Sequence, residues 1–366
     1  MANKIGIYIH VPFCCSKCAY CDFYSGKGSE SDFEQYTLML KKRIQSLGSR
    51  VTEEVSSVYF GGGTPSILGS DRLASILSAV KKGFKVCDDA EITVEVNPDS
   101  GRNLDFSLMK SAGFNRLSIG MQSCVEDELK KLGRIHTTDD VTATVNRAQS
   151  AGFDNISLDL MMGIPMQTRD TLKKSIDFCA ALKVKHISSY LLKIEKNTPF
   201  YAQKDLLNLP DEDAQADLYL FAVDYLDKLV YKQYEISNFS MPGFESRHNT
   251  LYWTCREYIG IGPSAHSFYH GERYFCNRNI NDFYEDKTVS DGAGGDPSEY
   301  IMLALRLKRG LVFEEYQNRF GTPLPAQTVN KLKLFADAGY MELDGQHACF
   351  TPKGFLLSNS IISEIL

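Results

Sequence analysis

Strand-like and helix-like segments alternate regularly over the first two thirds of the chain, and this alternation is the feature that most constrains the fold. The strand-like segments are short runs rich in β-branched residues. Between them, apolar residues recur at three- and four-residue intervals, as in amphipathic helices. Strands are predicted at residues 5–10, 55–60, 91–96, 116–121, 155–160 and 186–194. Helices are predicted at residues 33–47, 73–80, 104–111, 139–150 and 171–182.

The tetrapeptide Ser-Ala-Gly-Phe occurs at residues 111–114 and 150–153, both times between a predicted helix and the next strand. A glycine just past a helix end can adopt the left-handed conformation that caps the last carbonyl groups. Repeated strand–helix units predict parallel strands. Because a full eight-unit barrel needs about 250 residues and only six units are clear, the prediction is an α/β fold with a partial (βα)6 barrel. A doubly wound open sheet is the alternative.

The remaining third of the chain predicts a second, smaller unit. A helix at 211–229 and a strand at 234–236 complete the first part, and the polar, glycine-rich segment 286–297 is interpreted as a linker. Helices at 298–307, 314–320 and 328–338 precede a hairpin of 340–343 and 348–351 around Asp344-Gly345. The predicted organisation is a barrel domain at 1–235, a connecting region at 236–290 and a small winged-helix-like helical domain at 291–366.

Composition excludes several classes of protein and compartment. The 366 residues carry 40 Lys and Arg against 46 Asp and Glu, a net charge of −6, which argues against nucleic acid as a partner. No apolar run approaches the roughly 18 to 20 residues of a membrane span. The first 21 residues lack the apolar core of a signal peptide. We therefore expect a cytoplasmic protein, with at most transient membrane association through its partners.

Four of the ten cysteines lie within eight residues, directly after the first predicted strand. In a reducing compartment, such clustered thiols bind metal or do redox work. Functional groups of parallel folds collect at the carboxyl ends of strands. Iron–sulfur clusters that transfer electrons take four cysteine ligands. This loop supplies only three thiolates at the required spacing, from Cys14, Cys18 and Cys21, so one iron of a cubane cluster would lack a cysteine ligand and stay open for chemistry. Cys15 breaks the spacing. A zinc site of the three thiolates with His10 is the alternative.

Polar residues and glycines also stand at the ends of later strands. The run Gly61-Gly62-Gly63-Thr64-Pro65 follows the second strand, and glycine lets the backbone approach a ligand closely. Glu95 alternates with two valines and so points to the opposite face, into the barrel. A carboxylate is costly there without a partner, which predicts a bound polar ligand. Further polar residues follow the next strands: Gln122, Arg134 and Asp159.

The cysteine spacing, with Tyr20 before the last cysteine, resembles the signature of the radical S-adenosylmethionine (SAM) superfamily. The resemblance implies a [4Fe–4S] cluster on Cys14, Cys18 and Cys21, with SAM chelating the open iron through its amino and carboxylate groups. It implies that the glycine run lies near the SAM amino group and Asp159 near the ribose. The SAM-binding residues that it implies are Tyr8, Tyr20, Gly62, Gly63, Thr64, Glu95, Gln122, Arg134 and Asp159.

Over its whole length the chain resembles the coproporphyrinogen oxidase-like group of that superfamily. The likeness includes Tyr8-x-His10-x-Pro12-Phe13-Cys14 and implies a HemN-type helical domain at 291–366. Two departures count against the oxidase branch. Only seven residues precede Tyr8, where that branch has a longer extension, and Phe23 stands where it has a further cysteine.

A second branch of the group, the HemW haem chaperones, has the hallmark His-Asn-x-x-Tyr-Trp, which this chain matches with His248, Asn249, Tyr252 and Trp253. An imidazole can ligate haem iron, and tyrosine and tryptophan offer flat apolar surface. His266 and Cys255 are alternative ligands. The motif lies about 230 residues from the cysteine loop, so haem binding is expected to be independent of the cluster.

This resemblance implies a haem chaperone that hands haem to an acceptor haemoprotein, with an electron donor as a further partner if radical chemistry occurs. The rival interpretation is a radical SAM enzyme that acts on a porphyrinogen or haem, by oxidative decarboxylation or methyl transfer.

Overall fold

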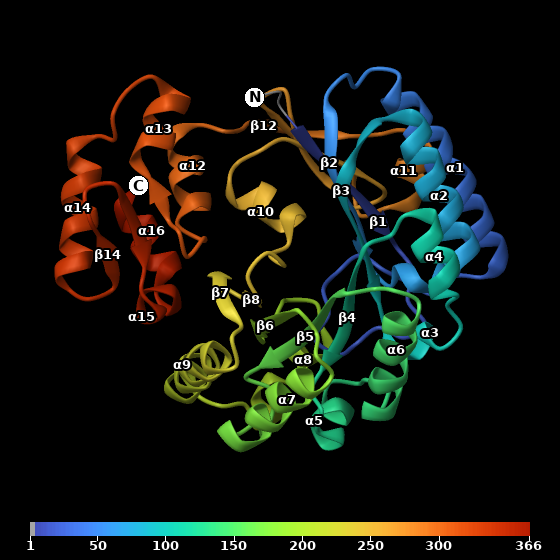
Figure 1. Ribbon diagram of the computed structural model, residues 1–366, viewed down its shortest axis with the longest axis horizontal. Coiled ribbons are helices and arrows are strands. Elements are labelled where there is room, and N and C mark those ends of the chain that lie inside the picture. The colour runs from blue at the N-terminus through green and yellow to red at the C-terminus, as the bar shows by residue number, and fades with distance from the viewer. Residues whose placement is uncertain (1–3) are drawn as a thin grey trace.

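Six parallel strands form the centre of a curved sheet in the computed structural model, which describes residues 4–366 (Figure 1). They pair in chain order, each with the next, as the alternation predicted. The strands are β1 (Lys4–Val11), β2 (Glu54–Gly62), β3 (Lys85–Val96), β4 (Arg116–Gln122), β5 (Asn155–Met162) and β6 (His186–Leu191).

Six shorter strands extend this sheet at both edges. Beside β1 lies a parallel strand followed by three antiparallel ones, β9 (Tyr258–Ile261), β10 (His266–Tyr269), β11 (Glu272–Phe275) and β12 (Val289–Ala293). Beside β6 lie the antiparallel strands β8 (Asn238–Ser240) and β7 (Lys232–Glu235). The order runs from β12 at one end to β7 at the other without closing. The sheet is therefore a partial barrel, as predicted. Its extension by short strands beyond β1 and beyond β6 was not predicted.

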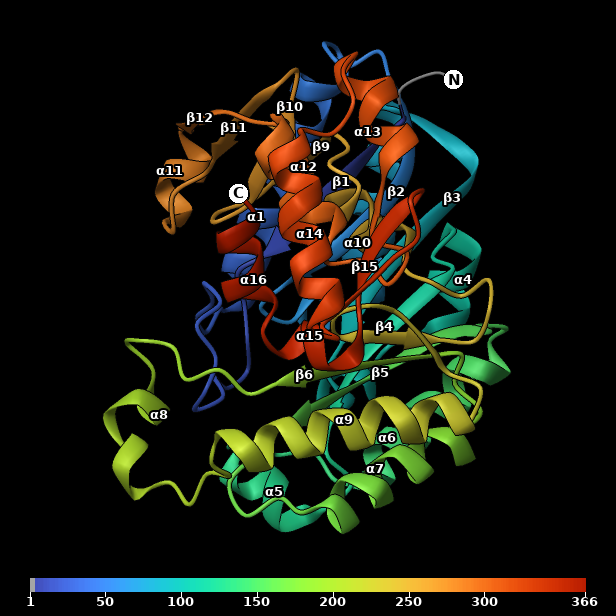
Figure 2. The same cartoon turned by 90° about the vertical axis from the view of Figure 1, so that its left-hand side faces the viewer.

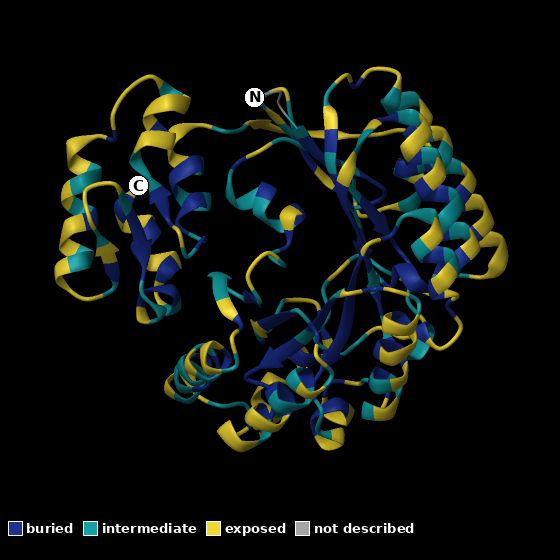
Figure 3. Ribbon diagram, viewed as in Figure 1, coloured by how far each residue is buried: buried dark blue, intermediate teal, exposed yellow. Residues whose placement is uncertain are grey.

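Helices cover the convex face of the sheet and expose their outer sides, while the strands are buried (Figures 1 and 3). Figure 2 shows α7 and α9 lying beside each other beneath the strands. The larger helices of this layer are α1 (Glu30–Gly48), α2 (Ser70–Gly83), α4 (Phe106–Ala112), α6 (Thr138–Ser150), α7 (Arg169–Ala181) and α9 (Glu212–Lys228). Shorter helices of the chain are η1 (Pro65–Leu68), α3 (Pro98–Gly101), α5 (Glu126–Lys131), α8 (Pro199–Ala202), η2 (Lys204–Leu206) and α11 (Ile280–Tyr284).

Both Ser-Ala-Gly-Phe junctions adopt the predicted capping geometry. Gly113 has φ +112° and Gly152 has φ +88°, the left-handed region that glycine enters without steric cost. The following phenylalanines, Phe114 and Phe153, donate their N–H groups to the carbonyls of Met109 and Ala148. Both phenylalanine side chains are buried. The repeat thus ends each helix and anchors the entry into β4 or β5.

Helix α10 (Arg247–Trp253) lies on the concave side of the sheet, against β1 and β2 (Figure 1). The Glu91 carboxylate on β3 accepts hydrogen bonds from the Arg247 and His248 amides, at 2.9 and 3.0 Å. These amides belong to the first turn, where helix N–H groups lack intrahelical partners. Glu91 therefore fixes the start of α10 inside the barrel.

The C-terminal unit packs beside the β7 edge. The Lys308 amide donates to the Tyr234 carbonyl at 2.9 Å and the Ile236 amide to the Arg306 carbonyl at 3.0 Å, so this contact covers an otherwise open sheet edge. Its helices are α12 (Pro297–Ala304), α13 (Phe313–Phe320), α14 (Ala326–Asp337), α15 (Pro352–Leu356) and α16 (Ser358–Ile365). Its small sheet is β13 (Leu311–Val312), β15 (His347–Phe350) and β14 (Met341–Leu343).

The structure differs from the prediction in the segments between the two units. Residues 286–297, expected as a linker, contain β12, and the expected connecting region 236–290 contributes β8 to β11 to the main sheet. Every residue of β12 is exposed. Because edge pairing rather than burial holds this strand, no alternation of apolar residues marks it. Within residues 4–366, no helix is both long and apolar enough to cross a membrane.

Candidate functional site

A cavity of about 320 Å³ opens at the carboxyl ends of β1 to β5. It is lined by eleven of the twelve residues that the sequence assigned to the cluster and SAM, so residues from four strands and three loops meet there. They are Cys14, Cys18, Tyr20, Cys21, Gly62, Gly63, Thr64, Glu95, Gln122, Arg134 and Asp159. The twelfth, Tyr8, does not line this cavity and lines a second cleft, described below.

The cysteine loop presents three thiols to this cavity. Cys14 Sγ lies 3.2 Å from Thr64 Oγ1, and the Cys21 amide donates to the Cys18 carbonyl at 3.2 Å. Cys15 is exposed and does not line the cavity. Among residues 4–366, no three His, Cys, Asp or Glu side chains converge closely enough for a single metal ion. A cubane needs no such convergence, because each thiolate binds a different iron, so the arrangement fits a cluster.

The zinc alternative with His10 is contradicted by the partners of that imidazole. His10 Nε2 lies 2.9 Å from the Tyr24 carbonyl and Nδ1 lies 3.1 Å from Tyr8 Oη. Burial lowers the pKa of His10 to about 4. Both ring nitrogens are therefore engaged, and His10 is a packed residue beneath the loop.

The glycine run lets the end of β2 pass close to the cysteine loop. A Cβ atom on Gly63 would lie 2.5 Å from the Phe13 carbonyl oxygen, and one on Gly62, where φ is +110°, would lie 2.8 Å from the His10 ring. The Gly63 and Thr64 amides donate to the Val11 and Phe13 carbonyls at 2.8 and 2.7 Å. Any larger residue would push β2 and the cysteine loop apart.

Two carboxyl groups face the cavity from β3 and β5. Tyr59 Oη donates to Glu95 Oε1 at 2.9 Å, and Ser118 Oγ lies 3.1 and 3.2 Å from the two oxygens of Asp159. Burial raises the pKa of Glu95 to about 8 and raises the pKa of Asp159 above its usual range. Because buried acids without a cation are costly, this wall favours a ligand with a positive or hydrogen-bond-donating group.

A guanidinium also lines the cavity, beside the end of β4. Arg134 donates through Nη1 to Asn97 Oδ1 and through Nη2 to the Gly120 carbonyl, both at 3.2 Å. Its Nε is buried without a hydrogen-bond partner. Gln122, at the end of β4, has φ +68°, a strained conformation of the kind found at ligand sites. Two carboxyl groups and a guanidinium in one cavity match a zwitterionic ligand.

The Glu95 carboxyl gives a pH-dependent prediction for the protein free of SAM. Its pKa is about 8 when folded and about 4.3 in an unfolded chain, so folding takes up a proton between these values. The free energy of unfolding should therefore fall as pH rises through this window, by at most about 1.4 kcal/mol per pH unit. Glu95→Gln mimics the neutral form and should show a smaller fall between pH 6 and pH 8.5 in urea unfolding. Parallel curves for the two proteins would contradict the assignment.

The structure buries His248 of the His-Asn-x-x-Tyr-Trp motif, which is 1% exposed. Its Nδ1 lies 2.8 Å from Ser57 Oγ and its Nε2 lies 2.8 Å from Tyr252 Oη. The ring stacks on Tyr59 at 5.2 Å between centroids. Burial lowers the pKa of His248 to about 3. Both nitrogens are thus occupied, and His248 would bind iron only after giving up one of these partners.

The other motif residues point in different directions. Tyr252 reaches the second cleft. The Trp253 indole N–H is buried beside the carboxyl group of Glu235, whose pKa burial raises to about 7. The Asn249 amide donates to Ser246 Oγ in the first turn of α10. The motif therefore serves to anchor α10 and presents one aromatic side chain, Tyr252, to a cleft.

The second cleft, of about 390 Å³, adjoins the first cavity. Phe23, which is 66% exposed, lines both. The alternative ligand His266 lines it, whereas Cys255 is buried beside Arg319. The lining residues are Tyr8, His10, Asp22, Phe23, Tyr24, Tyr252, Tyr258, Ser264, His266 and Arg278.

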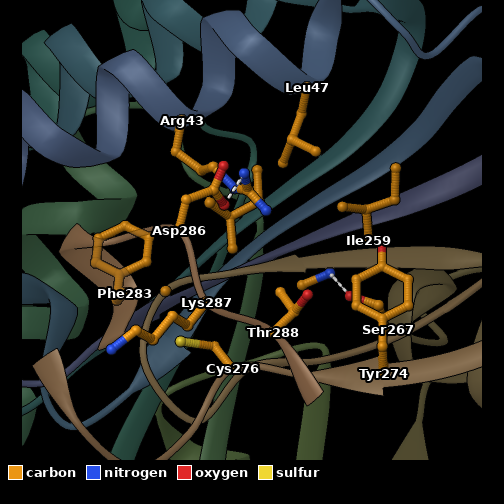
Figure 4. Close-up of a pocket in the computed structure, with 13 residues that line it drawn as sticks. Arg43, Leu47, Ile259, Ser267, Tyr274, Cys276, Phe283, Asp286, Lys287 and Thr288 are labelled. Carbon is orange, nitrogen blue, oxygen red and sulfur yellow. Dashed lines mark hydrogen bonds and ion pairs between the residues drawn. The ribbon is translucent and has the colours of Figure 1, made fainter. Parts of the chain in front are cut away.

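Figure 4 shows a third, water-sized cavity of about 20 Å³ between α1 and β9. Arg43 and Asp286 form an ion pair across it, and the Gly260 amide donates to Ser267 Oγ at 3.0 Å. It contains none of the predicted site residues and is too small for a ligand other than water.

Sequence reasoning missed Tyr59, Glu91, Asn97 and Ser118, which hold or supplement the predicted residues. The sequence does contain a local signal for two of them, Glu91 and Asn97. Glu91 lies four residues before Glu95 and therefore on the same face of β3, and Asn97 directly follows that strand's end. Tyr59 and Ser118 carry no local mark, because their role comes from pairing across strands.

Comparisons with known proteins agree with this geometry. The pattern of the Radical SAM superfamily matches residues 8–179, and that of the HemN C-terminal domain matches residues 296–357. Heme chaperone HemW of Lactococcus lactis subsp. lactis (strain IL1403) is 33% identical over 98% of this chain and 96% of its own length. Heme chaperone HemW of Bacillus subtilis (strain 168) is 33% identical over 98% of both chains.

A solved structure shares the whole fold. Coproporphyrinogen III oxidase (HemN) from Escherichia coli superposes with a TM-score of 0.84 at 21% identity, over 100% of this chain and 90% of its own. That likeness concerns the fold alone, whereas the relatives above extend over nearly the full length at above 30% identity. The chain belongs to the HemW family of haem chaperones, within the radical SAM superfamily.

Proposed function

We propose that this protein is a haem chaperone that binds haem and transfers it to acceptor haemoproteins, and that it carries a [4Fe–4S] cluster ligated by SAM. The observation that carries the proposal is the full-length similarity to proteins named heme chaperone HemW from several bacteria. The match to their His-Asn-x-x-Tyr-Trp hallmark in α10 supports it.

In this proposal Cys14, Cys18 and Cys21 hold the cluster. When bound, the cluster and SAM supply an open iron with its organic ligand and a source of one electron. The chain's own residues orient that ligand, because Glu95 and Asp159 can accept hydrogen bonds from its amino and hydroxyl groups and Arg134 can pair with its carboxylate. The remaining binding residues are Tyr20, Gly62, Gly63, Thr64 and Gln122.

Tyr8 supports the site from behind. A Cβ atom on Gly61 would lie 3.0 Å from Tyr8 and 3.1 Å from the Glu95 carboxylate, so the three groups are neighbours. Tyr8 also packs on Tyr59, with 6.2 Å between ring centroids. We assign Tyr8 to positioning Tyr59 and Glu95, not to direct contact with SAM.

The partners and compartment follow from the same proposal. A chaperone requires an acceptor haemoprotein, and redox use of the cluster requires an electron donor. Within residues 4–366, no helix could span a membrane and none of the ten cysteines forms a disulfide, and both observations are compatible with the cytoplasm. Any association with membranes would then be transient and depend on the acceptor.

Haem titration of the purified protein tests the function. We expect about one haem per chain and transfer of that haem to an apo-haemoprotein. Tyr252→Ala should weaken binding about ten-fold, because an aromatic wall of the cleft is lost. Tyr201→Ala, an exposed tyrosine on α8 outside the cleft, is the matched control and should bind as the unaltered protein does.

Two outcomes would overturn the proposal. The first is no haem binding by the unaltered protein. The second is turnover of coproporphyrinogen III at catalytic rates with SAM and a reductant, which would favour the radical enzyme.

A further inference from the structure

The second and third predicted cluster ligands, Cys18 and Cys21, lie on a part of the cysteine loop that distant segments hold through the backbone. Ala19, between them, has both of its main-chain polar groups engaged. Its amide donates to the Leu132 carbonyl at 3.4 Å, and its carbonyl accepts from the Phe200 amide at 3.0 Å. Main-chain polar groups need such partners, so residues far away in the sequence set the position of this stretch.

Phe200 belongs to the long connection between β6 and α9, residues 192–209, which we call the strap. It contains the short helices α8 and η2 and projects from the barrel in Figure 2. At its start the Leu192 amide donates to a carbonyl of β5 at 2.7 Å, and at its end the Asn208 carbonyl accepts from the Met166 amide at 2.9 Å. The strap is therefore anchored at both ends and reaches the cysteine loop between them.

Side chains of the strap and of the loops around it form a small hydrophobic cluster separate from the main core, which we call the satellite core. Its buried members are Leu132, Met161, Ile164, Leu192 and Phe200. Tyr20 packs on it, with 6.3 Å between the ring centroids of Tyr20 and Phe200. Tyr20 directly precedes the ligand Cys21 and lines the first cavity. Phe200, which is 3% exposed, therefore packs against the loop that carries the ligands.

The first ligand has a different support. The Cys14 amide donates to the Gly26 carbonyl at 2.9 Å, and the neighbouring Phe13 belongs to the main core. Cys14 is thus attached to the main core, whereas Cys18 and Cys21 are attached to the satellite core. A cubane cluster needs all three thiolates at fixed separations, because each binds a different iron. Its retention therefore depends on how firmly the strap holds the second part of the loop.

We propose that Phe200 is a positioning residue for the [4Fe–4S] cluster, and that the strap holds Cys18 and Cys21 in place and so slows the release of iron. The inference rests on the proposed cluster and its ligands, and it adds the element that retains the cluster. Opening of the strap would break the contact between Phe200 and Ala19 and let the second part of the loop move. The strap would then set the lifetime of the cluster without contributing a ligand.

Thr198 supports Phe200 from the start of α8. Its Oγ1 accepts a hydrogen bond from the Tyr201 amide at 3.2 Å and donates one to the Glu195 carbonyl at 2.7 Å. Thr198 is buried, so no water molecule can readily replace the hydroxyl. Loosening α8 at Thr198 should therefore weaken the hold on the loop from a position that touches no ligand.

The rate at which an iron chelator removes the cluster under anaerobic conditions measures this retention. Phe200→Ala should lose its visible cluster absorption about ten-fold faster than the unaltered protein, because local opening costs less free energy without the buried ring. The EPR spectrum of its reduced cluster should also change. Phe200→Leu keeps much of the apolar volume and should largely restore both. Thr198→Ala should accelerate the loss, whereas Thr198→Ser, which keeps the hydroxyl, should not.

Phe106→Ala separates positioning from general destabilisation. Phe106 is also 3% exposed, but it lies on α4 in the main core and does not line the first cavity. Its loss should lower the urea concentration at the midpoint of unfolding and leave the chelator rate of the native protein unchanged. Tyr201→Ala, an exposed neighbour of Phe200 on α8, should match the unaltered protein in both measurements.

Hydrogen exchange of the cluster-free protein tests the strap without iron. Phe200→Ala should speed exchange of the amides around Ala19, and Phe106→Ala should not. If the unaltered protein assembles no cluster, the proposed cofactor is wrong, and hydrogen exchange alone decides whether the strap holds the loop. Unchanged exchange in Phe200→Ala, or an unchanged chelator rate, would overturn the inference. An equal acceleration in Phe106→Ala would overturn it as well.

Discussion

Replacing Cys14, Cys18 and Cys21 together by alanine should abolish the iron–sulfur cluster after anaerobic reconstitution. The three thiols line one cavity, and burial raises the pKa of the Cys21 thiol. A thiolate at that position therefore needs the positive charge of iron beside it, so cluster and thiolates stabilise each other. Iron and sulfide analysis with EPR of the reduced protein measures the loss, which should be essentially complete.

Cys15→Ala is the matched control, because Cys15 lies in the same loop but is exposed and outside the cavity. It should retain the full iron content and the EPR signal. Equal loss of iron in Cys15→Ala and in the triple variant would show that the ligands are assigned wrongly.

Glu95→Ala and Asp159→Ala should each weaken SAM binding to the cluster-loaded protein without removing iron. Each loses an acceptor that two neighbouring strands place in the cavity, and a charge-assisted hydrogen bond contributes about 1 to 3 kcal/mol, or roughly 5- to 150-fold in affinity. Equilibrium dialysis gives the affinity, and the change that SAM causes in the EPR spectrum reports its contact with the cluster.

Asp154→Ala provides the control for charge, because Asp154 precedes the other end of β5 and pairs only loosely with Lys185, at 3.8 Å. It should bind SAM as the unaltered protein does. Unchanged SAM affinity in both cavity variants, or an equal loss in Asp154→Ala, would contradict the proposed site.

The expected independence of haem binding from the cluster has no support in the structure. It rested on the separation along the sequence, yet residues from both regions share one cleft. Asp22, Phe23 and Tyr24 directly follow the predicted ligand Cys21 and form a wall of the cleft that Tyr252 closes from α10. Distance along a chain says little about distance in a barrel, because each strand returns the chain to the same edge.

The sequence by itself determined those features of the protein that are encoded by residues close together in the chain. The period of the apolar residues marks strands and helices, the glycines at 113 and 152 mark helix ends, and the cysteine spacing marks a loop that holds three thiols. Glu95 could be placed because strand alternation fixes the face of a side chain. These features together predicted the partial barrel and most residues of the first cavity.

What only the tertiary structure decided is which groups are free to bind. His248 and His266 are both histidines beside aromatic residues, and the motif favoured His248. Its partner Ser57 lies 191 positions away, and no local pattern could reveal that this contact and Tyr252 occupy both of its nitrogens. Strand β10, which carries His266, belongs to an extension of the sheet whose edge strand β12 is exposed at every residue and has no burial alternation. Because the partners of a side chain are brought together by folding, the hydrogen bonds that engage His248 could be recognised only in three dimensions.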